Sequence, residues 1–182
     1  MDSYAPLKTR TIALVGMMGV GKSSVGRRLA TALDMPFRDA DAEVETAAGR
    51  SITDIFADLG EPAFREGERR VIARLLEEPP HVLATGGGGF INDETRRLIK
   101  AKAVSVWLKT DLAVLTRRLA RKADRPLLQG KDPLATLTEL ARARDPIYAQ
   151  ADIIVETTDS AHQAAVDLII SALSKHLEGQ PR

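Results

Sequence analysis

The segment Gly16–Ser23 constrains the fold of this chain more than any other, because it has the spacing G-x-x-x-x-G-K-S. Residues 11–15 before it form a short apolar run, which is typical of a buried strand. Residues 24–33 after it carry apolar side chains on one face of a helix. A strand, a glycine loop and a helix in this order are typical of a phosphate-binding loop, where backbone N–H groups and the helix N-terminus face an anion.

The two polar residues that end the loop suit such a site. The Lys22 ammonium can reach the β- and γ-phosphates of a nucleotide, and the Ser23 hydroxyl can ligate a Mg²⁺ ion that bridges them. The alternative interpretation is a plain glycine-rich turn. The strand before the loop and the helix after it favour nucleotide binding.

Length and composition exclude several other classes of protein. With 182 residues the chain is most simply one domain, and its net charge of +1 gives no electrostatic argument for a nucleic-acid or membrane partner. The sequence has no cysteine, which excludes disulfides, zinc–thiolate sites and thiol catalysis. The first ten residues do not resemble a secretory signal, and no run approaches the roughly eighteen apolar residues of a membrane span. We therefore expect a soluble cytoplasmic protein.

The order of the predicted elements indicates an α/β fold. Strands are expected at 11–15, 35–41, 81–84, 104–108 and 153–155. Helices are expected at 24–33, 42–49, 51–60, 61–78, 92–101, 111–120, from 132 onward, and over a final segment ending near 177. Alternating strands and helices form βαβ units with a parallel sheet, in which ligands bind beyond the carboxyl ends of the strands. Residues 121–131, polar and basic, are expected to form a lid.

Two carboxylates and four glycines lie at the expected strand ends. In an extended chain Asp39 and Asp41 project to the same side, so that one suits the Mg²⁺ water shell and the other a substrate hydroxyl. The alternative is an exposed helix start, where acids are also favoured. The run at 86–89 favours close approach of the backbone to a ligand, the alternative being a flexible loop.

Arginines supply the remaining candidates. Arg65 lies among glutamates, and a basic cluster spans 117–125, so both are expected to form solvated faces, with a functional role as the alternative. The proline in 121–131 makes a lid that clamps phosphates a second possibility. Arg144 precedes Asp145–Tyr148, and its role is open by the same argument.

Taken together, these segments resemble the shikimate kinase family from Thr11 to about Thr157. Besides the phosphate-binding loop, the residues that carry the resemblance are Phe37-x-Asp39-x-Asp41, Ile55-Phe56, Gly60-Glu61, Phe64-Arg65-x-x-Glu68, Gly86-Gly87-Gly88, Arg125-Pro126-Leu127-Leu128 and Arg144-x-Pro146-x-Tyr148. The resemblance implies a three-layer α/β/α fold similar to nucleoside monophosphate kinases, with a five-stranded parallel sheet and a mobile lid. It also implies ATP-dependent phosphorylation of the 3-hydroxyl of shikimate, on the route to chorismate and aromatic amino acids.

The resemblance also implies roles for individual residues. Lys22, Asp41 and Arg125 would be catalytic, with Asp41 as the general base and Arg125 as the lid arginine. Ser23 and Asp39 would support one Mg²⁺ ion, Asp39 through water. The expected ATP-binding residues are Gly19, Val20, Gly21, Lys22, Ser23, Ser24, Arg118 and Arg125. The expected substrate-binding residues, in a helical region over about 41–70 and beyond it, are Asp41, Arg65, Gly87 and Arg144.

The chain departs from the family pattern at two places. Gly89 is a fourth glycine and is expected to loosen its turn. The segment Thr157–His162 lacks the frequent proline or arginine near the adenine, which leaves His162 as a candidate contact. A gluconate kinase, a catalytically silent regulatory relative and a nucleic-acid-binding P-loop module are the rival interpretations. We expect a monomer that binds shikimate and ATP, without nucleic-acid or membrane partners.

Overall fold

The computed structural model describes residues 4–121, 130 and 132–179 of the chain. Its centre is a parallel sheet in the order β2-β3-β1-β4-β5. The strands are β1 (Thr11–Val15), β2 (Phe37–Asp39), β3 (Val82–Ala84), β4 (Ala103–Thr110) and β5 (Ile153–Thr157). Ile12 of β1 lies opposite Val82 of β3 and Val104 of β4, so β1 is in the middle of the sheet. The predicted five-stranded parallel sheet is confirmed.

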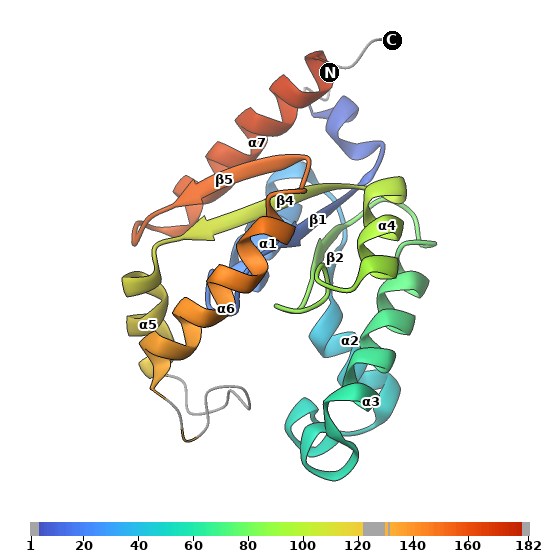
Figure 1. The fold of residues 1–182 in the computed structure, drawn as a ribbon. Helices are drawn as coiled ribbons and strands as arrows, with labels where there is room; N and C mark the ends of the chain where they lie inside the picture. Colours follow the sequence, from blue (N-terminus) through green and yellow to red (C-terminus); the bar gives the residue numbers. More distant parts are fainter. Residues whose placement is uncertain (1–3, 122–129, 131, 180–182) are drawn as a thin grey trace.

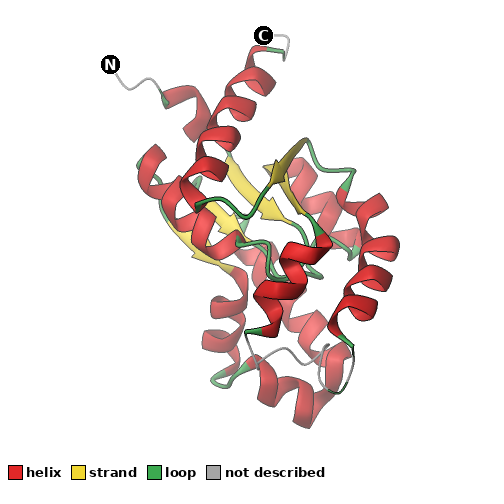
Figure 2. Cartoon of the chain, turned by 90° about the vertical axis from the view of Figure 1, so that its left-hand side faces the viewer, coloured by secondary structure: helices red, strands yellow, loops and turns green. Residues whose placement is uncertain are grey.

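Helices cover both faces of this sheet and complete three layers (Figure 1). The helices are α1 (Lys22–Leu33), α2 (Ala40–Ala48), α3 (Ile52–Leu75), α4 (Asp93–Lys102), α5 (Leu112–Ala120), α6 (Pro133–Tyr148) and α7 (His162–Glu178). Helices α1 and α7 pack together on one face, while α3, α4 and α6 cover the other (Figure 1). Figure 2 shows the strands enclosed between helices from a second side.

The carboxyl ends of the strands open between two groups of helices. On one side of the strand ends lie α2 and the first half of α3. On the other side lie α5 and the start of α6 (Figure 1). The loop after β1, Asp39 at the end of β2 and the glycines after β3 therefore meet at one edge, as the sequence predicts.

The two helices predicted over 51–60 and 61–78 follow one another without a loop and are labelled together as α3, and the predicted break at Gly60 is confirmed. Gly60 interrupts it with φ 82° and ψ 170°, values outside the helical region, and the chain continues through Pro62. The regular helix ends at Leu75 rather than at residue 78, and Pro79 disfavours the helical conformation at Glu78. Glu78 instead donates its N–H to the carbonyl of Leu75 at 3.0 Å, in a tighter turn.

Side-chain caps set several other boundaries. The Ser51 hydroxyl accepts the N–H of Asp54 at 3.1 Å, and the Asp132 carboxylate accepts the N–H of Ala135 at 3.1 Å, so both predicted helix starts are confirmed. A short 3₁₀ helix that the sequence does not predict, η1 (Ala5–Lys8), precedes β1, and its buried Leu7 belongs to the core beside α7. Within the described residues, no helix has the length and apolar character that crossing a membrane requires.

The core is dense where α1 crosses the sheet, and Gly26 makes that approach possible. A Cβ atom on Gly26 would lie 2.7 Å from Cε2 of Phe37 and 3.3 Å from Cδ1 of Leu14. Both neighbours are held in packed strands, so neither can withdraw freely.

We predict that Gly26→Ala lowers the free energy of unfolding by about 1–3 kcal/mol, because it overpacks this contact. Gly67→Ala in α3 is the matched control, since a Cβ atom there has no neighbour within 4 Å. The control should gain up to about 1 kcal/mol from the better helix propensity of alanine. Urea unfolding of the two variants measures both effects, and equal stability of the pair would contradict the packing argument.

Candidate functional site

The loop Gly16–Ser23 joins β1 to α1 and has the geometry of an anion site. Gly16, Gly19 and Gly21 have φ values of 139°, 81° and 94°, which residues with a side chain rarely adopt. Gly21 is also the N-cap residue of α1, so no side chain covers the first N–H groups of that helix. These N–H groups and the helix dipole can receive a phosphate group.

Lys22 lies across this loop rather than in solvent. Its Nζ atom donates to the carbonyl oxygens of Gly16 at 2.7 Å and Met17 at 2.8 Å, and the residue is 8% exposed. The carbonyls hold the ammonium group at the mouth of the loop. The charge is thus placed within the anion site before any ligand is considered.

Asp39 contacts both α1, the helix that follows the phosphate-binding loop, and α2, the next helix along the chain. The Ser23 hydroxyl donates to its Oδ2 atom at 2.5 Å, while its Oδ1 atom accepts the N–H groups of Asp41 at 3.0 Å and Ala42 at 3.3 Å. Asp39 is therefore the N-cap of α2, and Asp41 lies in the first helical turn. The predicted extended arrangement of the two acids is wrong, because capping by Asp39 ends β2 two residues before Asp41.

The first glycine of the run 86–89 makes room for two carboxylates. A Cβ atom on Gly86 would lie 2.5 Å from Oε2 of Glu68 and 2.7 Å from Oδ1 of Asp41. No other amino acid allows both acids to approach the backbone at this point. Gly86 thus allows the close approach of two side chains of the protein itself, and the expected approach of a ligand to this turn stays a prediction.

The other three glycines each face a different neighbour. A Cβ atom on Gly88 would overlap the guanidinium group of Arg65, and one on Gly87 would lie 3.4 Å from the backbone nitrogen of Met18. Gly89 faces Cδ1 of Ile72 at 3.0 Å, and its N–H group donates to the carbonyl of Gly86 at 3.1 Å. The Gly89 N–H group thus closes the turn beside α3, and the expectation that this glycine loosens the turn stays a prediction.

Arg65 is held between the glycine turn and two glutamates. Its Nη1 atom donates to Oε1 of Glu68 at 3.0 Å, and its Nη2 atom donates to Oε1 of Glu61 at 3.2 Å. The interpretation as a solvated ion-pair face fits only the bond to Glu61, because the Glu68 side chain is 3% exposed. Arg65 thus faces the carboxyl ends of the strands with its guanidinium orientation fixed.

Glu68 is a functional-site residue to which sequence reasoning gave no role. Burial raises the pKa of its carboxyl group, and Asp41 adds to this, while Arg65 and Arg144 oppose it. Its Oε2 atom has no hydrogen-bond partner among the described residues. The only signal in the sequence is the spacing Phe64-Arg65-x-x-Glu68, which places Arg65 and Glu68 on one helix face.

Helix α6 reaches the same turn from the other side. Nη1 of Arg144 donates to the carbonyl oxygen of Gly87 at 3.3 Å, and the hydroxyl group of Tyr148 donates to the same atom. The glycine turn therefore lies between Arg65 of α3 and Arg144 of α6. Two guanidinium groups at one turn can bind a carboxylate.

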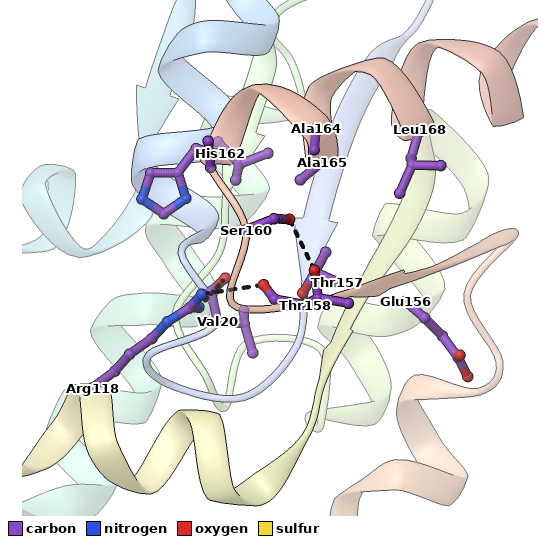
Figure 3. A pocket seen from close by; sticks show the side chains of 12 residues that line it. Val20, Arg118, Glu156, Thr157, Thr158, Ser160, His162, Ala164, Ala165 and Leu168 are labelled. Atoms are coloured by element: carbon purple, nitrogen blue, oxygen red, sulfur yellow. Dashed lines mark hydrogen bonds between the residues drawn. The ribbon is translucent and has the colours of Figure 1, made fainter.

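Arg118 and His162 flank the phosphate-binding loop on the side of β5 (Figure 3). Arg118 donates to the carbonyl oxygens of Gly19 at 3.3 Å and Val20 at 3.4 Å. His162 packs on Gly21, and burial lowers the pKa of its imidazole, with Arg28 and Arg118 adding to the effect. A small cavity of about 60 Å³ lies between these residues and includes Thr158 and Ser160 (Figure 3).

A larger cavity of about 430 Å³ connects most of these groups. The predicted site residues that line it are Gly19, Gly21, Lys22, Ser23, Ser24, Asp39, Asp41, Gly87 and Arg118. Val20 lines the small cavity instead, and Arg65 and Arg144 contact the glycine turn. Arg125 and most of the expected lid lie outside the described residues.

Known proteins resemble this chain over most of its length. The family model described as shikimate kinase matches residues 18–174. A shikimate kinase of Caulobacter vibrioides is 69% identical over 172 residues, which cover 94% of this chain and 86% of the relative. One of Bradyrhizobium diazoefficiens is 54% identical over 179 residues, covering 98% and 86% of the two chains.

Solved structures give the same result. A shikimate kinase from Acinetobacter baumannii in complex with shikimate has a TM-score of 0.89 and 36% sequence identity, and the match covers 91% of this chain and 93% of that one. A gluconokinase from Sinorhizobium meliloti has a TM-score of 0.59 at 19% identity, covering 94% and 95% of the two chains. The gluconokinase thus shares the fold alone.

The raised pKa of Glu68 predicts a pH-dependent contribution to stability. The folded protein binds the Glu68 proton more tightly than the unfolded chain, whose glutamate has the ordinary pKa of 4.5. This contribution is full below pH 4.5 and is lost as the pH rises through the raised pKa, by about 1.4 kcal/mol for each pH unit that separates the two pKa values. The stability of Glu68→Gln relative to the wild type should therefore increase from pH 5 to pH 8, as measured by urea unfolding.

Glu66→Gln is the matched control on the same helix. Hydrogen bonds from Arg69 and Arg70 lower the pKa of Glu66 to about 2, so its stabilising effect is complete above pH 4.5 and is lost as the pH falls toward 2. Its difference from the wild type should stay constant between pH 5 and pH 8. A constant difference for Glu68→Gln as well would contradict a raised pKa of Glu68.

Proposed function

The chain belongs to the shikimate kinase family, and from this we infer that it transfers the γ-phosphoryl group of ATP to the 3-hydroxyl group of shikimate. The products are shikimate 3-phosphate and ADP, in the biosynthesis of chorismate and aromatic amino acids. The observation that carries this conclusion is the common cavity of about 430 Å³, on which the phosphate-binding loop and the glycine turn both open. Donor and acceptor can therefore meet there.

The phosphate-binding loop forms the ATP-binding half of the site. We propose that the backbone of Gly19, Val20 and Gly21 surrounds the β-phosphate, and that Lys22 leaves the loop carbonyls to neutralise the β- and γ-phosphates. Ser24, next to Ser23 in the first turn of α1, offers a further N–H group at the helix N-terminus. Phosphoryl transfer requires mainly alignment and neutralisation of charge, and these groups supply both.

We propose that Ser23 and Asp39 hold one Mg²⁺ ion with the phosphates. Their oxygen atoms lie 2.5 Å apart, and hydroxyl and carboxylate oxygens are the hard donors that Mg²⁺ prefers. The ion is held mainly by phosphate oxygens and water in sites of this type, so two protein oxygens fit it. These two residues would hold the ion, which would supply positive charge to offset that of the phosphates.

The acceptor half lies around the glycine turn. We assign Asp41 as the group that orients the attacking hydroxyl and accepts its proton, because its carboxylate faces the turn at Gly86. Arg65 and Arg144 bind the shikimate carboxylate with their planar donor groups, and the backbone of Gly87 adds a further contact. The first helical turn of α2 and the helix α3 thus hold most of this half.

We propose the same domain organisation that the sequence predicts, with one kinase domain over 1–182. The helical region over about 41–70 binds the acceptor, and the lid over about 121–131 brings Arg125 to the phosphates. Arg118 flanks the nucleotide at the other end, where its contacts with the loop carbonyls support the assignment. We further propose a cytoplasmic monomer that binds neither nucleic acid nor membranes, because ATP and a small acid are its only expected partners.

The direct experiment measures ADP release from Mg-ATP with shikimate, gluconate and quinate offered in parallel. We expect turnover with shikimate and at most background rates with the other two acids, because the two arginines and the glycine turn are spaced for one ligand. An excess of EDTA should abolish the turnover and added Mg²⁺ should restore it. Absence of shikimate-dependent turnover would refute the proposed function.

Asp41→Asn tests the proposed base. We expect kcat to fall by about 10²–10⁴-fold, the usual contribution of a positioned base, while the Kd for ATP stays within about twofold. Asp167→Asn on α7, where the exposed acid accepts a hydrogen bond from Gln163, is the control and should keep full activity. Unchanged turnover of Asp41→Asn would remove Asp41 from this role.

A further inference from the structure

The carbonyl group of Gly87 is held by two donors from one helix. Nη1 of Arg144 donates to it at 3.3 Å, and the hydroxyl group of Tyr148 donates to the same oxygen atom. These residues are four positions apart in α6 and therefore lie on the same helix face. The glycine turn is thus attached to α6 through a single carbonyl group.

The ring of Tyr148 is itself held in a fixed position. Tyr148 is 1% exposed, and its ring centroid lies 5.8 Å from that of Trp107. Trp107 belongs to β4 and pairs with Val15, the last residue before the phosphate-binding loop. A Cβ atom on Gly16 would lie 3.3 Å from Cδ1 of Trp107, so the tryptophan also supports the start of the loop. The Tyr148 hydroxyl therefore projects from a rigid pair of rings.

This hydroxyl group remains a donor at any pH used for a kinase assay. Burial raises the pKa of Tyr148 to about 12, against the opposing effect of Arg144. A neutral phenol keeps its proton and directs it to the Gly87 carbonyl. Of the two donors, Tyr148 is the one whose side chain cannot turn toward a ligand.

The glycine turn needs such an outside attachment. Glycine loses more conformational freedom on folding than any other residue, and four in succession have no side chains to fix their peptide groups. Within the turn Gly89 donates to Gly86 and Ile91 donates to Gly88, both at 3.1 Å. The Gly87 carbonyl instead receives its donors from α6. Because a peptide group is planar, fixing this carbonyl also fixes the direction of the Gly88 N–H group.

We propose that Tyr148 is a positioning residue for the phosphoryl acceptor. Its hydroxyl orients the peptide between Gly87 and Gly88, and this peptide holds the turn and Arg144 in the arrangement that receives shikimate. The inference rests on the proposed function, since it names the residue that prepares the acceptor half of that site. Tyr148 acts through Gly87 and Arg144 and makes no contact with the substrate.

Tyr148→Phe is the direct test, because it keeps the ring against Trp107 and removes only the hydroxyl group. We expect the KM for shikimate to rise about five- to tenfold, the effect of one lost hydrogen bond, with kcat and the KM for ATP within about twofold. Amide hydrogen exchange over residues 86–91 should become faster, while exchange in the phosphate-binding loop stays the same. A purely structural role of the hydroxyl would not separate the two KM values.

Two further variants distinguish positioning from a general loss of stability. Ser105→Ala removes a buried hydroxyl group from β4, the strand that carries Trp107, where this hydroxyl donates to Asp152 at 2.9 Å. This control should lower the Tm and leave both KM values unchanged. Tyr148→Met removes the ring as well as the hydroxyl, and it should combine the raised KM for shikimate with a lower Tm.

Each outcome has a definite meaning. A KM for shikimate within twofold of the wild-type value in Tyr148→Phe would overturn the inference, as would an equal rise in both KM values. A wild-type enzyme that fails to phosphorylate shikimate would instead refute the proposed function. The two failures are therefore distinguished by the wild-type assay in the same experiment.

Discussion

The Asp39 carboxylate holds the two halves of the site in position relative to each other. One of its oxygen atoms accepts the Ser23 hydroxyl at the start of α1, and the other caps α2 through the N–H groups of Asp41 and Ala42. A cap of this kind is worth about 1 kcal/mol, and it also fixes the angle at which the helix leaves the sheet. The phosphate-binding loop and the proposed base are thereby joined through one side chain.

Charge is balanced around the glycine turn before any ligand is considered. Asp41 and Glu68 bring two carboxyl groups to Gly86, and Arg65 and Arg144 bring two guanidinium groups to Gly88 and Gly87. Burial of Glu68 disfavours its charged form, and the arginines oppose this effect. A ligand with both a carboxylate and hydroxyl groups fits this mixture better than a simple anion.

Local spacing made much of this structure predictable. The loop motif between a strand and a helix is specified within about twenty residues, and the alternation of strands and helices determines a parallel sheet. The Asp39–Asp41 geometry was mispredicted because a strand and a helix start compete there, and the capping bond decides the boundary. Tyr148 and Glu68 received no role, because their meaning depends on contacts with Gly87 and Gly86 far along the chain. Sequence periodicity gives no information about contacts between residues so far apart in the chain.

The turn at residues 86–89 also sets a limit on how this sequence can evolve. Every substitution of a glycine adds a Cβ atom, and each of the four positions faces a different neighbour. Tolerance should be least at Gly88, which faces a guanidinium group, and at Gly86, which faces two carboxylates. It should be greater at Gly87, where an added Cβ atom would meet its nearest neighbour, the backbone nitrogen of Met18, at 3.4 Å. The four glycine positions therefore differ in how well each tolerates a substitution, according to the neighbour that an added Cβ atom would meet. This ranking of the positions offers a way to recognise working sites among divergent relatives.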